Sequence, residues 1–143
     1  WLVNTGKERF YWGYWFYKAS EEYGVEYKED YAYMTWHGDP YFDLDQWNSD
    51  YCASFPSPDG PVNTPWFEEC REGIDDFRYL SMLSTLVKRT GDRAAEGFLK
   101  ELLAPVNLDL SENTPWSGKT CDVSRERLAE LIEKLSTAAG REP

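Results

Sequence analysis

Histidine is almost missing from this chain, because His37 is the only one among 143 residues. A mechanism that needs imidazole therefore depends on one residue, which follows a predicted strand and suits a turn better than a ligand contact. Cysteine is scarce too, and Cys52, Cys70 and Cys121 lie far apart. Their spacing is not that of a zinc site, for which Cys and His must cluster. The count allows at most one intrachain disulfide and leaves the compartment open.

Basic residues are also few, since 15 Lys and Arg stand against 26 Asp and Glu for a net charge of −11. Phosphate contacts need clustered Lys and Arg, so this balance argues against a nucleic-acid partner. It argues equally against an anionic membrane surface. No apolar run approaches the ~20 residues that span a bilayer, and no signal peptide is visible. We expect neither nucleic acid nor a membrane as a partner.

Aromatic residues are abundant instead, with seven Trp, ten Tyr and seven Phe making up 17% of the chain. A disordered acidic chain is poor in aromatics, so the composition predicts a folded chain. The length suits one domain, and such a chain can bury roughly two-thirds of its unfolded surface. Because the chain begins at Trp1 rather than Met, we expect that an upstream segment was removed or that this is part of a longer polypeptide.

Hydrophobic periodicity predicts two strands and four helices. Residues 1–4 end a buried strand, and residues 26–36 alternate side chains as a strand does. Apolar side chains recur at helical spacings of three and four in the remaining segments. The predicted helices cover residues 9–23, 65–90, 94–103 and 123–138. Strands separated by a helix imply a parallel α/β sheet, which two strands cannot complete. We therefore expect an incomplete unit.

Aromatic rings and carboxylates alternate in and around the long loop 37–61, just after the second predicted strand. Ligands of parallel sheets bind at the carboxyl ends of strands. Rings such as Trp36 beside acids such as Asp39 suit a sugar. Alternatively, the aromatics form the loop's own small core and the acids are solvated. A calcium loop at Asp39, Asp43 and Asp45 is a further alternative, although the spacing is not that of an EF-hand.

Three pairs of adjacent acidic residues lie on predicted helices, away from the strand ends. Neighbours on a helix point about 100° apart, so none is placed like a glycosidase pair. We expect Asp75 and Asp76 to make structural contacts with Arg71, Arg78 or Tyr79. No Ser or Cys stands in a nucleophile-elbow context. These three helical pairs are Glu21–Glu22, Glu68–Glu69 and Asp75–Asp76.

Three segments resemble glycoside hydrolase family 123-like proteins. REGIDDFRYL (71–80), preceded by PDGPVNTPWFEEC, resembles the last helix of that barrel. HGDPYFDLD and NTGKERFYWGYWFYKA resemble its final strand-end loop and the helix before it. The resemblance covers residues 1 to about 100 and implies the last strands and helices of a (β/α)8 (TIM) barrel. On this basis residues 1–104 belong to the barrel, and residues 105–143 are a loop and a C-terminal helical tail.

The resemblance also implies a function on glycans. In such enzymes the acetamido group of the substrate is the nucleophile, assisted by an Asp-Glu pair on an earlier strand, which would lie upstream of Trp1. We therefore expect no catalytic residue, cofactor or metal in this chain. By position in the barrel, the resemblance implies sugar contacts from Asn4, Trp36, Asp39 and Tyr41. A barrel takes about 250 residues, so upstream polypeptide would supply the rest. The glycan role favours an extracellular or periplasmic location.

Two other functions remain open at this point. One is a non-catalytic glycan-binding or structural protein on the same barrel, because one fold hosts many roles. The other is an independent small interaction domain that binds a protein partner through exposed aromatic side chains. The second alternative predicts that residues 1–143 fold alone and expose an apolar patch.

Overall fold

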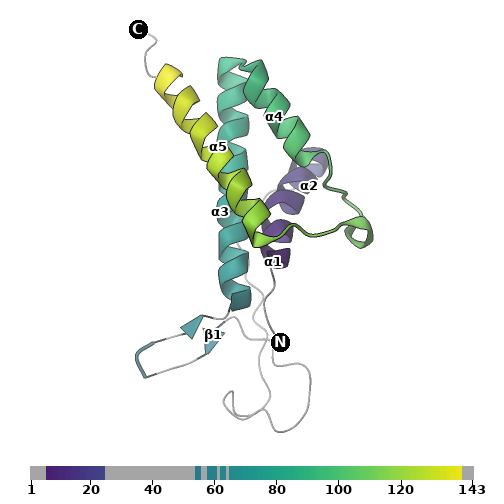
Figure 1. Ribbon diagram of the computed structural model, residues 1–143, viewed down its shortest axis with the longest axis vertical. Helices are drawn as coiled ribbons and strands as arrows, with labels where there is room; N and C mark the ends of the chain where they lie inside the picture. The colour runs from purple at the N-terminus through teal and green to yellow at the C-terminus, as the bar shows by residue number, and fades with distance from the viewer. Residues whose placement is uncertain (1–5, 25–53, 56–57, 61, 64, 140–143) are drawn as a thin grey trace.

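A long central helix, α3 (Pro65–Thr90), organises the part of the chain that the structure describes (Figure 1). The structure is a computed structural model, and it describes residues 6–24, 54–55, 58–60, 62–63 and 65–139. These residues are mostly helical. The other elements are α1 (Lys7–Phe10), the π-helical turn η1 (Tyr11–Trp15), α2 (Phe16–Tyr23), β1 (Ser54–Phe55), β2 (Val62–Asn63), α4 (Arg93–Leu103), the 3₁₀ turn η2 (Leu110–Glu112) and α5 (Gly118–Ala139).

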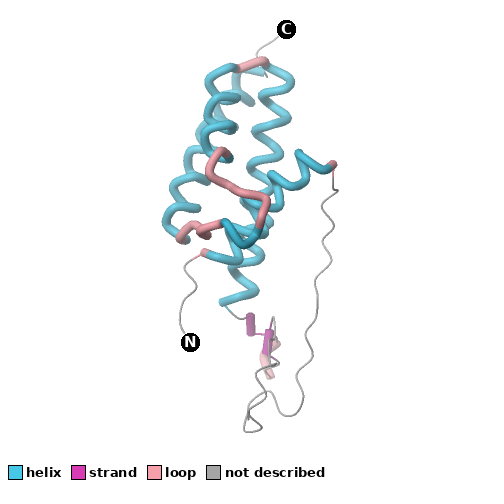
Figure 2. Tube along the Cα trace, turned by 90° about the vertical axis from the view of Figure 1, so that its right-hand side faces the viewer, coloured by secondary structure: helices cyan, strands magenta, loops and turns pink. Residues whose placement is uncertain are grey.

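The helices pack against one another, and the strand pair lies beyond the N-terminal end of α3 (Figure 2). Both α5 and the continuous segment from α1 to α2 lie against α3, and α4 runs back along α3 after a short turn. The two strands pair antiparallel, with Ser54 opposite Asn63 and Phe55 opposite Val62. No other strand is found in the described ranges.

The expected barrel fold is therefore wrong for the described residues, and so is the TIM-barrel basis for a glycoside hydrolase. The apolar stripe of α3 is real, but it contacts other helices rather than a parallel sheet. Hydrophobic periodicity shows which face of a helix is buried and not what covers it. The predicted strands at 1–4 and 26–36 lie outside the described residues.

The predicted helices themselves are confirmed, because their signals are local. Gly24 ends α2 in the left-handed conformation at φ 64°, and Gly91 follows α3 at φ 68°. Asp92 caps α4, where its carboxylate accepts hydrogen bonds from the backbone N–H groups of Ala94 and Ala95 at 3.0 and 2.9 Å. Side-chain oxygens at this position satisfy N–H groups that the helix leaves unpaired.

The last helix begins five residues earlier than the predicted start at residue 123. Ser117 precedes α5, and its hydroxyl accepts a hydrogen bond from the Thr120 backbone N–H at 3.2 Å. This is an N-cap, which the apolar pattern alone does not reveal because the first turn contributes only Cys121 to the core.

The N-terminal segment crosses α3 where two glycines face each other. A Cβ atom on Gly73 would lie 2.7 Å from the Trp12 Cβ and 2.8 Å from the Arg9 carbonyl oxygen. A Cβ atom on Gly13 would lie 3.0 Å from the Gly73 carbonyl oxygen. The two backbones are therefore too close for any side chain at residue 73. The π-helical turn lies at this crossing.

The core contains both aliphatic and aromatic side chains. Tyr14 is completely buried, and its hydroxyl donates to the Cys121 carbonyl oxygen at 3.2 Å. The ring of Trp116, in the loop before α5, lies 4.6 Å from the Tyr14 ring and 5.3 Å from the Phe10 ring, measured between centroids. This aromatic cluster attaches the loop to the N-terminal segment. Leu80, Leu83 and Leu128 complete the centre from α3 and α5.

Candidate functional site between α2, α3 and α4

The predicted sugar contacts cannot be placed on this fold. Asn4, Trp36, Asp39 and Tyr41 all lie outside the described residues, as does the loop that holds them. The alternatives for that loop, a sugar site, a calcium site or a small core of its own, therefore stay predictions. His37 and Cys52 lie outside the described residues as well.

The acidic residues of the central helix make structural contacts, as predicted. Asp75 accepts hydrogen bonds from Arg71 at 3.5 Å and from Arg78 at 3.2 Å, on the exposed face of α3. Asp76 has different partners from those expected. Its buried carboxylate accepts hydrogen bonds from the Nε atoms of Arg9 at 2.6 Å and Arg125 at 2.5 Å. These partners lie on other helices, so no local sequence pattern indicates them.

The Asp76 carboxylate is the centre of an ion network that joins three helices. Arg9 also donates to Asp122 of α5 at 2.5 Å. Arg125 also donates to the Glu72 carboxylate at 2.5 Å and to the Glu72 carbonyl oxygen at 2.6 Å. The Asp76 side chain is 0% exposed, so no substrate reaches it. The network is structural.

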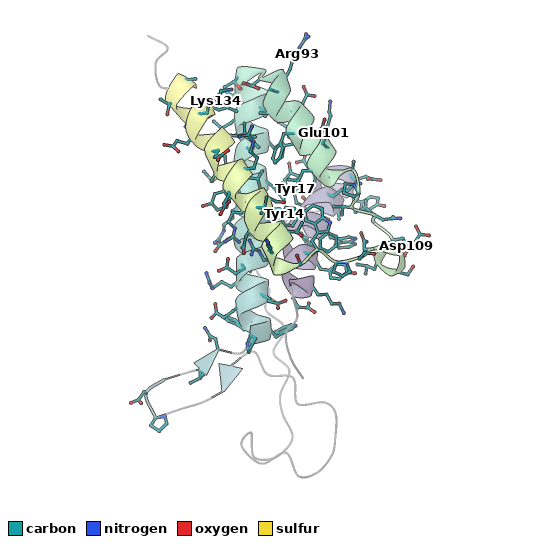
Figure 3. The ribbon with its side chains drawn as sticks, in the orientation of Figure 1. Tyr14, Tyr17, Arg93, Glu101, Asp109 and Lys134 are labelled. Atoms are coloured by element: carbon teal, nitrogen blue, oxygen red, sulfur yellow. The ribbon has the colours of Figure 1, made fainter. Side chains whose placement is uncertain are left out.

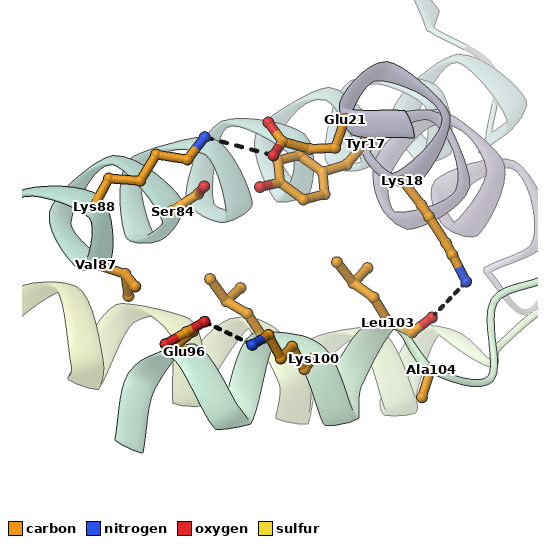
Figure 4. Close-up of a pocket in the computed structure, with 11 residues that line it drawn as sticks. Tyr17, Lys18, Glu21, Ser84, Val87, Lys88, Glu96, Lys100, Leu103 and Ala104 are labelled. Atoms are coloured by element: carbon orange, nitrogen blue, oxygen red, sulfur yellow. Dashed lines mark hydrogen bonds and ion pairs between the residues drawn. The ribbon is translucent and has the colours of Figure 1, made fainter. Parts of the chain in front are cut away.

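A cleft between α2, α3 and α4 is the strongest candidate for a binding site. It measures about 410 Å³, and its floor is formed by Tyr17, Val87, Leu99 and Leu103 (Figure 4). Tyr17 and Leu99 are buried, whereas Val87 and Leu103 are half-buried. The cleft exists because α4 packs along α3 while α2 covers only part of the surface between them.

Two ion pairs lie on the rims of the cleft. Lys88 of α3 contacts Glu21 of α2 at 3.5 Å on one rim. Lys100 contacts Glu96 at 2.6 Å, one turn apart on α4. All four side chains are exposed, so each pair contributes little to stability, typically about 0–1 kcal/mol. A partner can therefore replace these contacts at little cost.

A second cleft of about 390 Å³ adjoins the first at Lys18 and Ala104, which line both. It is formed by α2 and the loop that follows α4. The Lys18 ammonium donates hydrogen bonds to the carbonyl oxygens of Val106 at 2.5 Å and Leu103 at 3.1 Å. We call the two clefts together the groove; the Lys18 side chain spans their junction, and the lining is apolar toward Val87 and more polar toward Asn107.

The phenol and thiol groups in and near the core are held in their neutral forms. Burial raises the pKa of the Tyr17 hydroxyl, although a hydrogen bond with Ser84 opposes the rise. Burial also raises the pKa of the Cys70 and Cys121 thiols to about 12. Figure 3 shows Tyr14 and Tyr17 within the helical body, whereas Arg93 and Glu101 point outward from α4. Neither thiol is suited to nucleophilic attack near neutral pH, because the thiolate is the reactive form.

Other sites in the described part of the chain are weaker. A groove of about 430 Å³ between α3 and α5 contains the exposed Met82, but no charged pair flanks it. The described residues contain no cluster of three His, Cys, Asp or Glu side chains that could hold a metal ion. In the same ranges, no helix combines the length and apolarity that crossing a bilayer requires.

Comparison with known proteins adds no family, because no family model, curated protein or solved structure matches this chain.

The groove was not predicted from the sequence. The apolar spacing over residues 94–103 predicts a helix with one buried face, and it does not indicate that Leu103 stays half-buried beside a cleft. Lys18 carried no signal beyond its place on a predicted helix.

Proposed function

We propose that the helical part of this chain is a non-catalytic protein-interaction domain that holds an apolar peptide segment of a partner in the cleft between α2, α3 and α4. The supporting observation is the aliphatic floor of Val87, Leu99 and Leu103 between two charged rims. Grooves of this kind bind amphipathic segments, whose apolar side chains enter the groove while polar ones contact the rims. The rims here carry both signs of charge, which suits such a segment.

The shape of the groove favours a peptide over a small molecule. Small-molecule sites enclose 70–90% or more of the ligand surface. The cleft here is open between the two rims, as Figure 4 shows, and a second cleft adjoins it at Lys18 and Ala104. A peptide can lie across this open side with its apolar side chains on the floor, whereas a small ligand would be enclosed only in part.

A sugar suits this cleft poorly. Sugars pack their C–H faces on flat aromatic rings and donate hydroxyl hydrogens to acids. The one aromatic side chain on this floor, Tyr17, is only 4% exposed and so offers no open ring face. The predicted contacts of a glycan with Trp36, Asp39 and Tyr41 belong to a different part of the chain. They form a separate hypothesis with its own test, which is glycan affinity after Trp36→Ala.

The test begins with selection of random dodecapeptides, displayed on phage, against the full chain. Selected peptides are synthesised and their affinities measured by calorimetry on the wild type and on Ala104→Trp. Ala104 is exposed and lines both clefts, so an indole there fills the groove from its edge. We expect Ala104→Trp to weaken binding by about tenfold or more, because apolar anchors dominate such interfaces.

Ala94→Trp is the matched control, because Ala94 is also exposed on α4 and lines neither cleft. It should bind the selected peptides as the wild type does. Methyl and amide NMR shifts on peptide addition should move at Val87, Leu99 and Leu103. Selected peptides that bind both Trp variants equally and leave these shifts unchanged would overturn the proposal, as would a selection that yields no binder.

A further inference from the structure

We infer that the peptide carries a carboxylate beside its apolar residues, and that this carboxylate pairs with the Lys18 ammonium at the junction of the two clefts. The inference rests on the proposed function, since it assumes that a peptide occupies the groove. It adds the chemistry of the partner: an acidic side chain of a protein, placed at one defined point of the groove.

The Lys18 ammonium is fixed in position but its charge is not neutralised by any acid in the described ranges. Its hydrogen-bond partners, the carbonyl oxygens of Leu103 and Val106, are both neutral. Within the described part of the chain, no carboxylate oxygen lies within 4.0 Å of it. Lysine carries three N–H donors, and two are used here. One donor and a full positive charge remain for a ligand at the groove.

The other two lysines of the cleft differ in this respect. Lys88 and Lys100 each already have a carboxylate within 4 Å, on Glu21 and Glu96. The side chains of Lys88 and Lys100 are also exposed, and each is held by a single ion pair. Lys18 is half-buried and held by two hydrogen bonds, so binding an anion there orders few additional rotamers. Charge complementarity therefore points to Lys18.

Lys18 also has a structural role, which the test must separate from binding. Its ammonium lies at the C-terminal end of α4, where unpaired carbonyl groups favour a cation. Removing it should lower stability whether or not an acid binds. A purely structural lysine, however, does not distinguish a peptide that carries an acid from the same peptide with an amide.

The experiment is a double-mutant cycle on the full chain. One selected peptide that binds the groove is made with its Glu or Asp residue and with the matching Gln or Asn. We expect the acid form to bind the wild type about tenfold tighter, or ~1.4 kcal/mol. The ratio should fall to about one in Lys18→Met and stay large in Lys119→Met, which removes an exposed lysine that lines neither cleft. Circular dichroism confirms that both variants are folded.

A second variant tests the effect of charge at this point of the groove without removing the Lys18 hydrogen bonds at the end of α4. Glu22 lines the second cleft one turn beyond Lys18 and is exposed, so it repels an acid bound there. Glu22→Gln should strengthen binding of the acid peptide a few-fold and leave the amide peptide unchanged. Equal affinities of the two peptides for the wild type would overturn the inference while the groove binding stood. Loss of all groove-dependent binding would overturn the proposed function instead.

Discussion

Arg9 and Asp76 are 67 positions apart in the sequence and form a buried ion pair, with 2.6 Å between Arg9 Nε and Asp76 Oδ2. The pair attaches the N-terminal segment to α3, and Arg125 extends it to α5. A buried pair contributes little net stability, because desolvation offsets the attraction, but breaking it leaves an uncompensated charge. The network therefore matters most for which helices pack together.

Asp76→Asn should be strongly destabilising. The substitution keeps the shape of the side chain but leaves Arg9 and Arg125 without their shared carboxylate. We expect a loss of about 3–5 kcal/mol in the free energy of unfolding, which urea titration followed by Trp fluorescence measures. Asp75→Asn is the matched control, because Asp75 pairs on the exposed face, and it should cost no more than about 1 kcal/mol. Equal effects of the two substitutions would show that the buried network is not needed.

The close crossing of the N-terminal segment and α3 gives a second prediction. Gly73→Ala should destabilise the fold by about 1–3 kcal/mol, because the new methyl group meets the Trp12 Cβ and the Arg9 carbonyl oxygen. Both contacts are below 3.0 Å, and the backbone oxygen cannot rotate away. Thermal and urea unfolding monitored by circular dichroism measure the loss.

Gly97→Ala is the control for helix propensity. Gly97 lies within α4, and a Cβ there meets no atom within 4 Å. Alanine is favoured over glycine in a helix by about 0.5–1 kcal/mol, so this variant should be at least as stable as the wild type. A Gly73→Ala protein that gains stability in the same way would mean that the helices do not cross at this glycine.

The sequence predicted the described helices well because their signals are local. The apolar stripe of α3 depends on side chains three and four residues apart, and the stops at Gly24 and Gly91 are single residues at the helix ends. The start of α5 was placed too late, because its first turn depends on Ser117 rather than on apolar spacing.

The arrangement of the helices was not predictable from the same signals. The apolar stripe of α3 is compatible with a helix on a barrel and with a helix in a bundle. The barrel predicted from the sequence was therefore wrong. Long-range pairs such as Arg9 with Asp76, and the facing glycines at 13 and 73, leave no local pattern. The groove depends on how α2 and α4 pack against α3, and this packing leaves no local pattern in the sequence. The predicted sugar contacts fall outside the described residues and stay predictions.

The buried thiols give a prediction on reactivity and pH. In a Cys52→Ser background, Cys70 and Cys121 should react slowly with Ellman's reagent in the native protein and rapidly in urea. Both are buried, and burial raises the pKa of each thiol from its ordinary value near 9 to about 12. Rapid modification of the native protein near neutral pH would contradict this placement.

The raised pKa of the Cys70 and Cys121 thiols also determines how the free energy of unfolding changes at alkaline pH. The unfolded thiols ionise near pH 9, whereas the folded thiols stay protonated up to about pH 12. The unfolded state therefore releases protons first, and the free energy of unfolding should fall as the pH rises from 9 to 12. In Cys70→Ala/Cys121→Ala the fall should be smaller, because those two ionisations are absent while the raised pKa of Tyr14 remains. Urea titrations at several pH values measure both slopes, and parallel slopes would show that the thiols ionise alike in both states.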